Sequence, residues 1–436
     1  MQKIIGIRRE DKNQWERRVP LIPEHVRFLK EKHGIHTIVQ PSGNRIYTDD
    51  EFRAAGAEIN EDLGRAQTIF AVKEIPIELF EEGKTYIFFS HTIKGQGYNM
   101  DMLRRMRDLK VNLFDYERFV GKNNNRLIFF GRYAGLAGMI ETLHAYGQKM
   151  KMRGYDTPLS RIKQAYEYPS LEAAKQEIAQ IGEEIDEYGF GEDISPLVVG
   201  FAGYGNVSQG AQEIFDLLPY KTMSPQILSE MYENFTLDHF NLYKVIFKEE
   251  DLVRPIEGIF DKQDYFDHPE KYEAQFEEYI PYLQILVNCI YWTEDYPRLV
   301  TKEYLKNQTL LRSNLNLKVI GDISCDIDGS IEITHKATMP DTPNFTYFAD
   351  KDAYEDGIHR LGVTVMAVDN LPCEFSREAS AEFSEVLKDY VDNIASQNYD
   401  GPFEELNLDA PSEKALILQK GEFTNDYKYM EDFLKQ

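Results

Sequence analysis

A strand, a glycine turn and a helix follow one another in LVVGFAGYGNVSQGAQEIF, residues 197–215, and this order constrains the fold more than any other feature. Residues 197–202 have the continuous apolar character of a buried parallel strand, and a helical pattern follows the turn. Gly203 allows the tight turn, and Gly205 allows the backbone to approach a pyrophosphate at the helix N-terminus. The segment therefore favours a dinucleotide-binding turn over an ordinary glycine turn in an α/β domain.

The third glycine of the usual dinucleotide motif is replaced by Ser208. Serine is small enough for close packing of helix against strand, and Gly210 follows within one helical turn. The acidic residue that commonly binds the ribose 2′-hydroxyl is expected about 20 residues after the first glycine. Residues 219–226 offer Lys221, Thr222 and Ser224 there, but no carboxylate. This composition favours NADP, as NADPH, over NAD, and places Lys221 among the cofactor-binding residues.

The first 120 residues alternate short apolar runs with helical patterns, which is typical of a mainly parallel α/β sheet. Specific helix signals are Pro23 followed by Gly34 at the ends of one helix, and a capping box of Thr48 and Glu51 at the start of another. Further along the chain we expect helices over 99–109, 131–150 and 376–396, a polar helical insertion over 160–187, and an aromatic, acidic insertion over 230–280.

Three apolar runs of the first half each end in an ionisable residue. TIFAVKE contains Lys73, TYIFFSH ends in His91, and VNLFDYE ends in Glu117. If these runs are parallel strands, the three side chains lie at the carboxyl edge of one sheet, where open α/β sheets bind ligands. Cations accompany them: Arg8, Arg9, Arg17 and Arg18 after the first strand, and Lys94 after His91. Each residue alone could be a solvated or capping side chain, but their coincidence favours a site.

The residue types at this edge indicate chemistry on a carbonyl or imine. A lysine that is desolvated among other cations has a lowered pKa and can act as a base. A histidine exchanges protons near neutrality. The clustered cations suit an acidic substrate.

Composition excludes several classes of protein. Lys plus Arg number 49 and Asp plus Glu number 74, so the formal net charge is −25, which disfavours nucleic acid and anionic lipid as partners. The three cysteines, Cys289, Cys325 and Cys373, form no CxxC motif, so neither a disulfide scaffold nor a thiolate zinc site is expected, and we predict no metal. We find no signal-like segment and no run of 18 apolar residues, and we expect a cytoplasmic protein without a membrane span.

Motifs spread along the chain resemble those of lysine–ketoglutarate reductase, the saccharopine-forming dehydrogenase related to alanine dehydrogenases and transhydrogenases. The resembling stretches are RREDKNQWERRVPLIPEHV (8–26), FFSHTIKGQ (88–96), LFDYERFV (113–120), FFGRYAGLAGMI (129–140), FAGYGNVSQGAQEIFDLLP (201–219), NCIYW (288–292), DISCDIDGSIEI (322–333) and DNLP (369–372). They occur in family order, and the serine after GNV belongs to the family's pattern.

The resemblance implies an α/β fold of two domains, each with a mainly parallel sheet. A Rossmann-type domain, 141–370, would be inserted between the two parts of a substrate domain, 1–140 and 371–436. The resemblance also implies residue roles. Lys73 and His91 would be the acid–base pair, tuned by Glu117. The substrate would be bound by Arg18, Lys94, Arg126 and Asn288, and the cofactor by Gly203, Gly205, Asn206, Val207, Ser208, Lys221, Asp326, Asn370 and Leu371.

The implied reaction is NADPH-dependent reductive condensation of L-lysine with 2-oxoglutarate to saccharopine, in lysine degradation. Two alternatives stay open: an opine-type dehydrogenase with another amino donor, and a catalytically silent nucleotide-binding regulatory protein. A homo-oligomer is compatible with the sequence. Animal and plant members are usually fused to a saccharopine-cleaving dehydrogenase. This sequence ends at Gln436, so we expect a stand-alone form with a separate enzyme as its pathway partner. Arg132 stands where the family has an aromatic residue, which affects the amino-acid side of the pocket.

Overall fold

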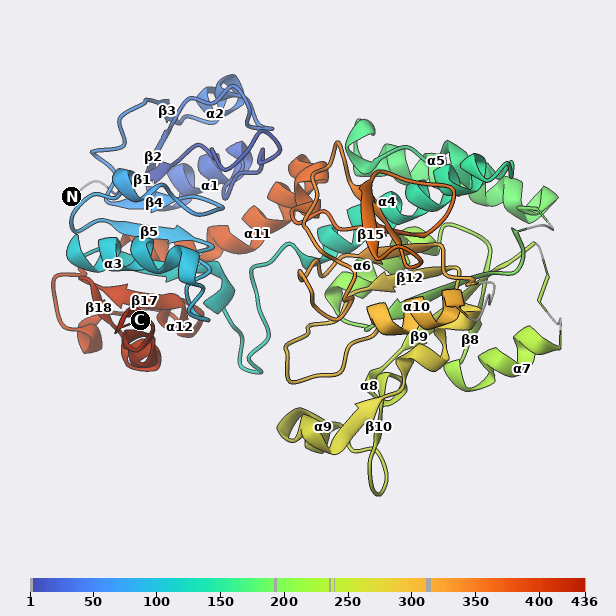
Figure 1. Ribbon diagram of the computed structural model, residues 1–436. Coiled ribbons are helices and arrows are strands. Elements are labelled where there is room, and N and C mark those ends of the chain that lie inside the picture. Colours follow the sequence, from blue (N-terminus) through green and yellow to red (C-terminus); the bar gives the residue numbers. More distant parts are fainter. Residues whose placement is uncertain (1–2, 192–193, 235–236, 239, 311–314, 436) are drawn as a thin grey trace. The chain divides into compact units, whose positions relative to one another are not determined.

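The computed structural model describes residues 3–191, 194–234, 237–238, 240–310 and 315–435. The chain forms two compact units (Figure 1). Unit 1 consists of Met1–Phe130 and Ser376–Gln436, and unit 2 is the intervening Gly131–Phe375. Among the described residues, no helix is long and apolar enough to cross a membrane.

The sheet of unit 1 has eight strands in the order β18-β17-β6-β5-β4-β1-β2-β3. Strands β1 to β6 are parallel, whereas β17 is antiparallel to β6, and β18 to β17. The strands are β1 (Ile4–Ile7), β2 (His36–Val39), β3 (Glu58–Ile59), β4 (Thr68–Phe70), β5 (Thr85–Phe88), β6 (Asn112–Asp115), β17 (Leu416–Gln419) and β18 (Glu422–Phe423).

Local sequence signals set the ends of the first two helices of unit 1. The first, α1 (Pro23–His33), starts at a proline and ends at Gly34, whose φ of 66° lies in the left-handed region that glycine adopts readily. The next, α2 (Asp49–Ala54), begins with the predicted capping box of Thr48 and Glu51, which is confirmed. The remaining helices are α3 (Met100–Asp108), α11 (Ser376–Ala395) and α12 (Ala410–Ala415).

Unit 2 contains a second eight-stranded sheet, in the order β15-β14-β16-β13-β12-β7-β9-β8. Six strands are parallel, while β14 runs antiparallel to β16, and β15 to β14. The fold predicted from the sequence, two mainly parallel sheets with the second unit inserted into the first, is confirmed. The strands are β7 (Leu197–Ala202), β8 (Tyr220–Met223), β9 (Leu242–Phe247), β12 (Ile285–Asn288), β13 (Val319–Asp322), β14 (Asn344–Phe348), β15 (Ala353–Asp356) and β16 (Val363–Met366).

The prediction that residues 230–280 form an insertion is wrong for β9. This strand pairs with β7 along its whole length and therefore lies inside the sheet, between β7 and the edge strand β8. Its sequence LYKVIF places a lysine inside the apolar run, and Lys244 is accommodated because its ammonium pairs with Asp216 at 2.5 Å. The rest of the segment does form an appendage to the sheet (Figure 1): α8 (Glu249–Leu252), the antiparallel pair β10 (Val253–Pro255) and β11 (Tyr272–Ala274), and α9 (Lys262–Asp267).

Two helices of unit 2 approach each other through glycines. On α4 (Gly131–Met152), a Cβ added to Gly135 would lie 1.9 Å from the carbonyl oxygen of Val207. On α6 (Asn206–Phe215), a Cβ added to Gly210 would lie 2.1 Å from the carbonyl oxygen of Arg132. Only glycine fits at either contact. Gly210 thus serves helix–helix packing in the glycine-turn motif. The other helices are α5 (Leu171–Tyr188), α7 (Leu228–Glu233) and α10 (Lys302–Leu310).

Candidate active site

The parallel register of unit 1 brings the predicted catalytic residues to one edge. Phe70 pairs with Ile87, and Phe88 pairs with Asp115, so β4, β5 and β6 end side by side. Lys73, His91 and Glu117 follow these three strand ends within a few residues. The sequence-based placement of the three residues at one carboxyl edge is therefore what the strand pairing shows.

Lys73 lies on a segment whose backbone is held by Glu10. The carboxylate of Glu10 accepts hydrogen bonds from the backbone N–H groups of Val72, at 2.7 Å, and Lys73, at 3.0 Å. Burial, and then the charges of Arg18 and Lys12, lower the pKa of the Lys73 ammonium. Burial, and then the charge of Glu16, raise the pKa of Glu10 to about 7. The edge thus holds a carboxyl group, that of Glu10, able to exchange protons near neutral pH, beside a lysine whose pKa is lowered.

Arg18 is held by a buried carboxylate. Its Nε and Nη2 lie 2.8 Å and 2.5 Å from the two carboxylate oxygens of Glu16. Both side chains are almost fully buried, and the guanidinium also lies 4.2 Å from the ring centroid of Phe130. Such a two-point pair fixes the guanidinium plane and maintains its charge beside Lys73.

The imidazole of His91 is oriented by Glu74. Its Nδ1 lies 2.5 Å from Oε1 of Glu74, and Lys12 lies 3.5 Å from the other carboxylate oxygen. Burial of Glu74 opposes ionisation, but the hydrogen bond and charge of His91, with the charge of Lys12, lower the pKa of Glu74 to about 2. An ionised Glu74 can only accept, so Nδ1 carries the hydrogen and Nε2 is the nitrogen that can exchange a proton.

The backbone at His91 is unusual as well. Its φ is 47°, a conformation that non-glycine residues seldom adopt. The Asn99 side chain donates to the carbonyl oxygens of Ser90, at 3.0 Å, and His91, at 3.3 Å. These bonds hold the strained turn, which is a common feature of active sites. A cavity of about 540 Å³ opens beside it, lined by Lys12, Glu74 and Asn99 among others.

The other predicted residues of unit 1 have different environments. Glu117 forms an ion pair with Arg126, with 2.9 Å between Oε1 and Nη2, while the main charges acting on Lys73 come from other residues. Lys94 is exposed three residues after His91. The loop arginines that accompany Arg18 have other partners: Arg8 pairs with Asp11, Arg9 pairs with Glu61, and the Nε of Arg17 donates to the carbonyl oxygen of Asn44 at 3.2 Å.

The glycine turn of unit 2 has the geometry of a dinucleotide-binding turn. Gly203 adopts a φ of 94°, and Gly205 is the N-cap of α6, which begins at Asn206 and continues through Val207 and Ser208. A Cβ on Gly205 would meet no atom within 4 Å, so the backbone there is open to a ligand. A cavity of about 470 Å³ is lined by this turn, by the end of β9 and by aromatic residues after β12. An anionic diphosphate suits this helix N-terminus.

Lys221 does not lie beside this turn. It belongs to β8, the edge strand, which pairs with β9 and not with β7, and its ammonium pairs with Asp238 at 2.7 Å. Residues 219–226 therefore do not end the strand next to the glycine turn. That strand is β9, and its end contributes Lys248 and Glu249 to the cavity. The carboxylate of Glu249 is contacted by Lys262 at 3.0 Å.

Asn288 and Asp322 form a buried network at the ends of β12 and β13. The Asn288 amide donates to Asp322, at 2.8 Å, and to Ser330, at 2.9 Å. Thr334 also donates to Asp322, at 2.6 Å, yet burial raises the pKa of this carboxyl to about 6. The amide nitrogen of Asn288, a residue expected as a substrate ligand, thus orders this edge of the sheet, while its buried Oδ1 has no hydrogen-bond partner among the described residues.

The remaining cofactor candidates follow the same carboxyl edge of unit 2. Asp326 is exposed in the turn after β13, where its carbonyl accepts from the N–H of Gly329 at 3.0 Å. Asn370 and the buried Leu371 follow β16 and lead into the short helix η11 (Leu371–Phe375). Arg132, the departure from the family pattern, forms two hydrogen bonds with Glu213 of α6, at 3.0 Å and 2.8 Å.

Sequence reasoning missed the carboxylates that organise the first unit's edge, namely Glu10, Glu16 and Glu74. Glu74 stands directly after Lys73, and Glu16 stands two residues before Arg18, so adjacency to a selected cation was the available signal. It also missed Lys248 and Glu249, because the run that precedes them was assigned to an insertion. Within the described ranges, no group of three or more His, Cys, Asp or Glu side chains is placed to hold a metal ion.

Comparisons with known proteins agree with this architecture. Residues 6–137 match the model of the alanine dehydrogenase/PNT N-terminal domain. The chain is 40% identical to alpha-aminoadipic semialdehyde synthase of Arabidopsis thaliana, over 98% of the chain and 41% of that protein. It is 35% identical to the mitochondrial alpha-aminoadipic semialdehyde synthase of Mus musculus, over 98% of the chain and 47% of that protein. The chain thus spans less than half the length of these curated relatives.

A solved structure gives the same fold. An L-alanine dehydrogenase superposes with a TM-score of 0.63 at 15% identity, covering 99% of both chains. Together with the sequence relatives, this confirms the family resemblance drawn from the motifs. Residues 6–137 are thus similar to the alanine dehydrogenase/PNT N-terminal domain, and along its length the chain is homologous to one part of alpha-aminoadipic semialdehyde synthase.

Proposed function

We propose that this chain is an oxidoreductase that condenses L-lysine with 2-oxoglutarate reductively, using NADPH, to give saccharopine. The observation that carries the proposal is the edge of unit 1, where Lys73, with its lowered pKa, and the His91–Glu74 pair follow neighbouring strands. Relatives that are 35–40% identical across 98% of the chain are named as alpha-aminoadipic semialdehyde synthases. More distant relatives are named as saccharopine dehydrogenases.

The proposed reaction balances as follows. The lysine amine adds to the ketone carbon of 2-oxoglutarate, water leaves to form an imine, and a hydride with a proton reduces the imine to a secondary amine. A nicotinamide dinucleotide supplies the hydride. Neutral Lys73 would accept a proton from the attacking amine, and His91 would donate one through Nε2 as water leaves. Arg18, Lys94 and Arg126 would bind substrate carboxylates, and Glu117 would position Arg126.

The residues of unit 2 would hold the cofactor. The N–H groups of Asn206, Val207 and Ser208 at the start of α6 would contact the pyrophosphate, with Gly203 and Gly205 allowing close approach. Asp326, Asn370 and Leu371 would lie by the nicotinamide, and Asn288 would order that edge. The preference for NADPH rests on Lys248, which lines the cavity next to the glycine turn and forms no ion pair among the described residues. Glu249 is already neutralised by Lys262, so a 2′-phosphate would not face a lone carboxylate.

The proposal is tested by NADPH oxidation with 2-oxoglutarate and a panel of amino acids. L-Lysine should give the highest kcat/KM, and saccharopine should be the product. A higher kcat/KM with another amino acid would support the opine-type alternative. A homo-oligomer, a cytoplasmic location and a separate saccharopine-cleaving dehydrogenase stay predictions.

Two substitutions test the residue roles. Lys73→Met and His91→Gln should each lower kcat by about 10²–10⁴-fold, the usual contribution of a general acid or base. The dissociation constant for NADPH should stay nearly unchanged, because the glycine turn belongs to the other unit. A double variant with wild-type kcat would exclude this acid–base pair and support the catalytically silent alternative.

A further inference from the structure

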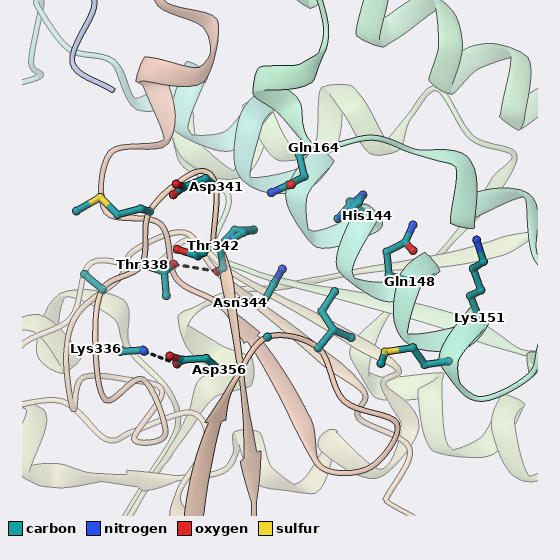
Figure 2. A pocket seen from close by; sticks show the side chains of 16 residues that line it. His144, Gln148, Lys151, Gln164, Lys336, Thr338, Asp341, Thr342, Asn344 and Asp356 are labelled. Atoms are coloured by element: carbon teal, nitrogen blue, oxygen red, sulfur yellow. Dashed lines mark hydrogen bonds and ion pairs between the residues drawn. The ribbon is translucent and has the colours of Figure 1, made fainter. Parts of the chain in front are cut away.

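A second cavity in unit 2 has no role in the proposed reaction. Its volume is about 890 Å³, within the range of about 300–1,000 Å³ that is typical of small-molecule sites. It is bordered by α4, by Gln164, and by the segments 336–344 and 356–358 around β14 and β15 (Figure 2). Residues of the glycine turn do not line it, so it is distinct from the dinucleotide cavity.

His144 presents a hydrogen-bond acceptor to this cavity. Its Nδ1 lies 2.7 Å from the carbonyl oxygen of Ile162, so this nitrogen must carry the hydrogen. Burial lowers the pKa of His144, which favours the neutral ring, in which Nε2 carries a lone pair. One turn along α4, the amide nitrogen of Gln148 donates to Ser160 at 2.8 Å, which leaves its oxygen as a second acceptor.

Asn344 presents an amide from the opposite wall. The residue begins β14 and is 6% exposed, and its Oδ1 is buried with no hydrogen-bond partner among the described residues. Figure 2 shows its amide nitrogen pointing into the open space below Gln164 and His144. The Oδ1 can only accept, so only a donor would satisfy it, whereas the amide nitrogen can donate to an anionic group in the cavity.

Opposite charges border the same cavity. The exposed Lys151 and Asp341 both line it, and neither forms an ion pair among the described residues, whereas Lys336 and Asp356 pair with each other. Figure 2 shows Asp341 and Lys151 on opposite sides of the space, with His144, Gln148 and Asn344 between them. Apolar side chains, including Met152 and Ile358, complete the lining. The cavity thus offers an anion, a cation, neutral acceptors and one amide.

We propose that this cavity is a binding site for a free basic amino acid. The side-chain cation of the ligand would donate to Asp341, its α-ammonium to the neutral acceptors of α4, and its carboxylate would accept from Lys151 and the Asn344 amide nitrogen. A dicarboxylate such as 2-oxoglutarate lacks the ammonium, and a nucleoside lacks the pair of opposite charges. The site is independent of the proposed reaction.

The lining of this cavity is hydrogen-bonded to the segment that directly follows β16. The backbone N–H of the lining residue Thr338 donates to the carbonyl of Ala367 at 2.8 Å, and Thr338 bridges Val368. Asn370, a candidate nicotinamide neighbour, follows two residues later. Occupancy of the cavity is thereby connected through one short segment to the carboxyl edge of the sheet.

The test is calorimetric titration of the full chain with the standard L-amino acids, 2-oxoglutarate and adenosine. At least one basic amino acid should bind, and Asp341→Asn should weaken that binding by about tenfold or more, as expected for a hydrogen bond to a charged group. Asn344→Leu should weaken it comparably. Asp350→Asn removes a charge from an exposed residue that does not line the cavity, and should leave the affinity unchanged.

Binding at the substrate site is distinguished by Lys73→Met. Affinity that falls in Lys73→Met and persists in Asp341→Asn and Asn344→Leu would place the ligand at the substrate site and overturn the proposal. Absence of binding by every basic amino acid would also overturn it, as would adenosine or 2-oxoglutarate binding in their place. Because Asp341 is exposed, Asp341→Asn should fold normally, and it therefore tests the proposal even if Asn344→Leu does not fold.

Discussion

The Nδ1 of His91 and the Oε1 of Glu74 lie 2.5 Å apart, although the two residues follow different strands of the first sheet. Glu74 follows β4, and His91 follows β5. The pair exists only because the strands are parallel and adjacent, so both side chains emerge at one edge. Glu74 fixes the tautomer of the imidazole and directs Nε2 away from itself.

Glu74→Gln should lower kcat by about 10- to 10³-fold, while the KM for NADPH stays nearly constant. The amide cannot stabilise a charged imidazole and can present its N–H to Nδ1, which favours the wrong tautomer. Steady-state kinetics with both substrates measures the effect. Glu78→Gln, at an exposed position of the same unit, is the matched control. Equal activity of the two variants would remove Glu74 from the mechanism.

Lys12→Ala should move the acidic limb of the kcat/KM profile to higher pH. The positive charge of Lys12 helps lower the pKa of Lys73, so its removal lets that pKa rise. If neutral Lys73 is the base, a higher pH is then needed to reach full activity. Lys110→Ala, which removes a lysine before β6 at the opposite edge, should leave the limb in place. A shift toward lower pH would contradict the assigned role.

Lys248→Ala should raise the KM for NADPH by about 10- to 100-fold, the effect of losing one hydrogen bond to a charged group, and leave the KM for NADH nearly unchanged. Lys248 lines the cavity beside the glycine turn, whereas Lys221 lies on the edge strand and is paired with Asp238. Lys221→Ala is therefore the matched variant, with little effect expected. A raised KM for NADPH in Lys221→Ala but not in Lys248→Ala would place the binding site of the 2′-phosphate at β8. A preference of the wild type for NADH would reject NADPH as the cofactor.

Glu374→Gln should stabilise the protein more at pH 8 than at pH 5. Burial raises the pKa of Glu141, and burial with the charge of Glu141 raises that of Glu374. The folded state therefore keeps a proton that the unfolded state has lost above its ordinary pKa of 4.5, and stability falls as pH rises from there through the raised folded pKa. One such proton contributes a slope of up to about 1.4 kcal/mol per pH unit.

Denaturant unfolding of wild type and variant between pH 5 and pH 8 measures this difference. Glu230→Gln, at an exposed position of the same unit, should show no such pH dependence. A difference between Glu374→Gln and wild type that is constant with pH would mean that the carboxyl pair is not protonated in the folded state.

Strand ends were the most predictable part of the candidate site. Apolar runs with period and length typical of strands located β4, β5 and β6, and the parallel register then placed Lys73, His91 and Glu117 together. The partners of these residues were not predictable in the same way. The contacts of Glu10 with Val72 and of Glu74 with His91 join residues that are distant in sequence, and no periodicity encodes them.

The order of strands in unit 2 shows the same limit. Local pattern identifies β8 and β9 as chain segments, but tertiary pairing decides which of them lies beside β7. The lysine inside β9 weakened its apolar pattern, and its pairing with Asp216 is a long-range contact. The cofactor preference was thus inferred from a strand that lies one position too far from the turn.

The pairing of β6 with β17 has a consequence for synthesis on the ribosome. Strand β6 is complete once Asp115 has emerged, yet its neighbour Leu416–Gln419 is translated only after the whole of unit 2. Until then, the backbone of β6 presents an unpaired edge, a type of surface that can pair with other nascent chains. Rapid folding of unit 2 would shorten the time during which this edge of β6 is unpaired. Substitutions that slow the folding of unit 2, such as Gly135→Ala at the α4–α6 contact, would therefore lower the yield of native protein by prolonging the exposure of β6 in unit 1.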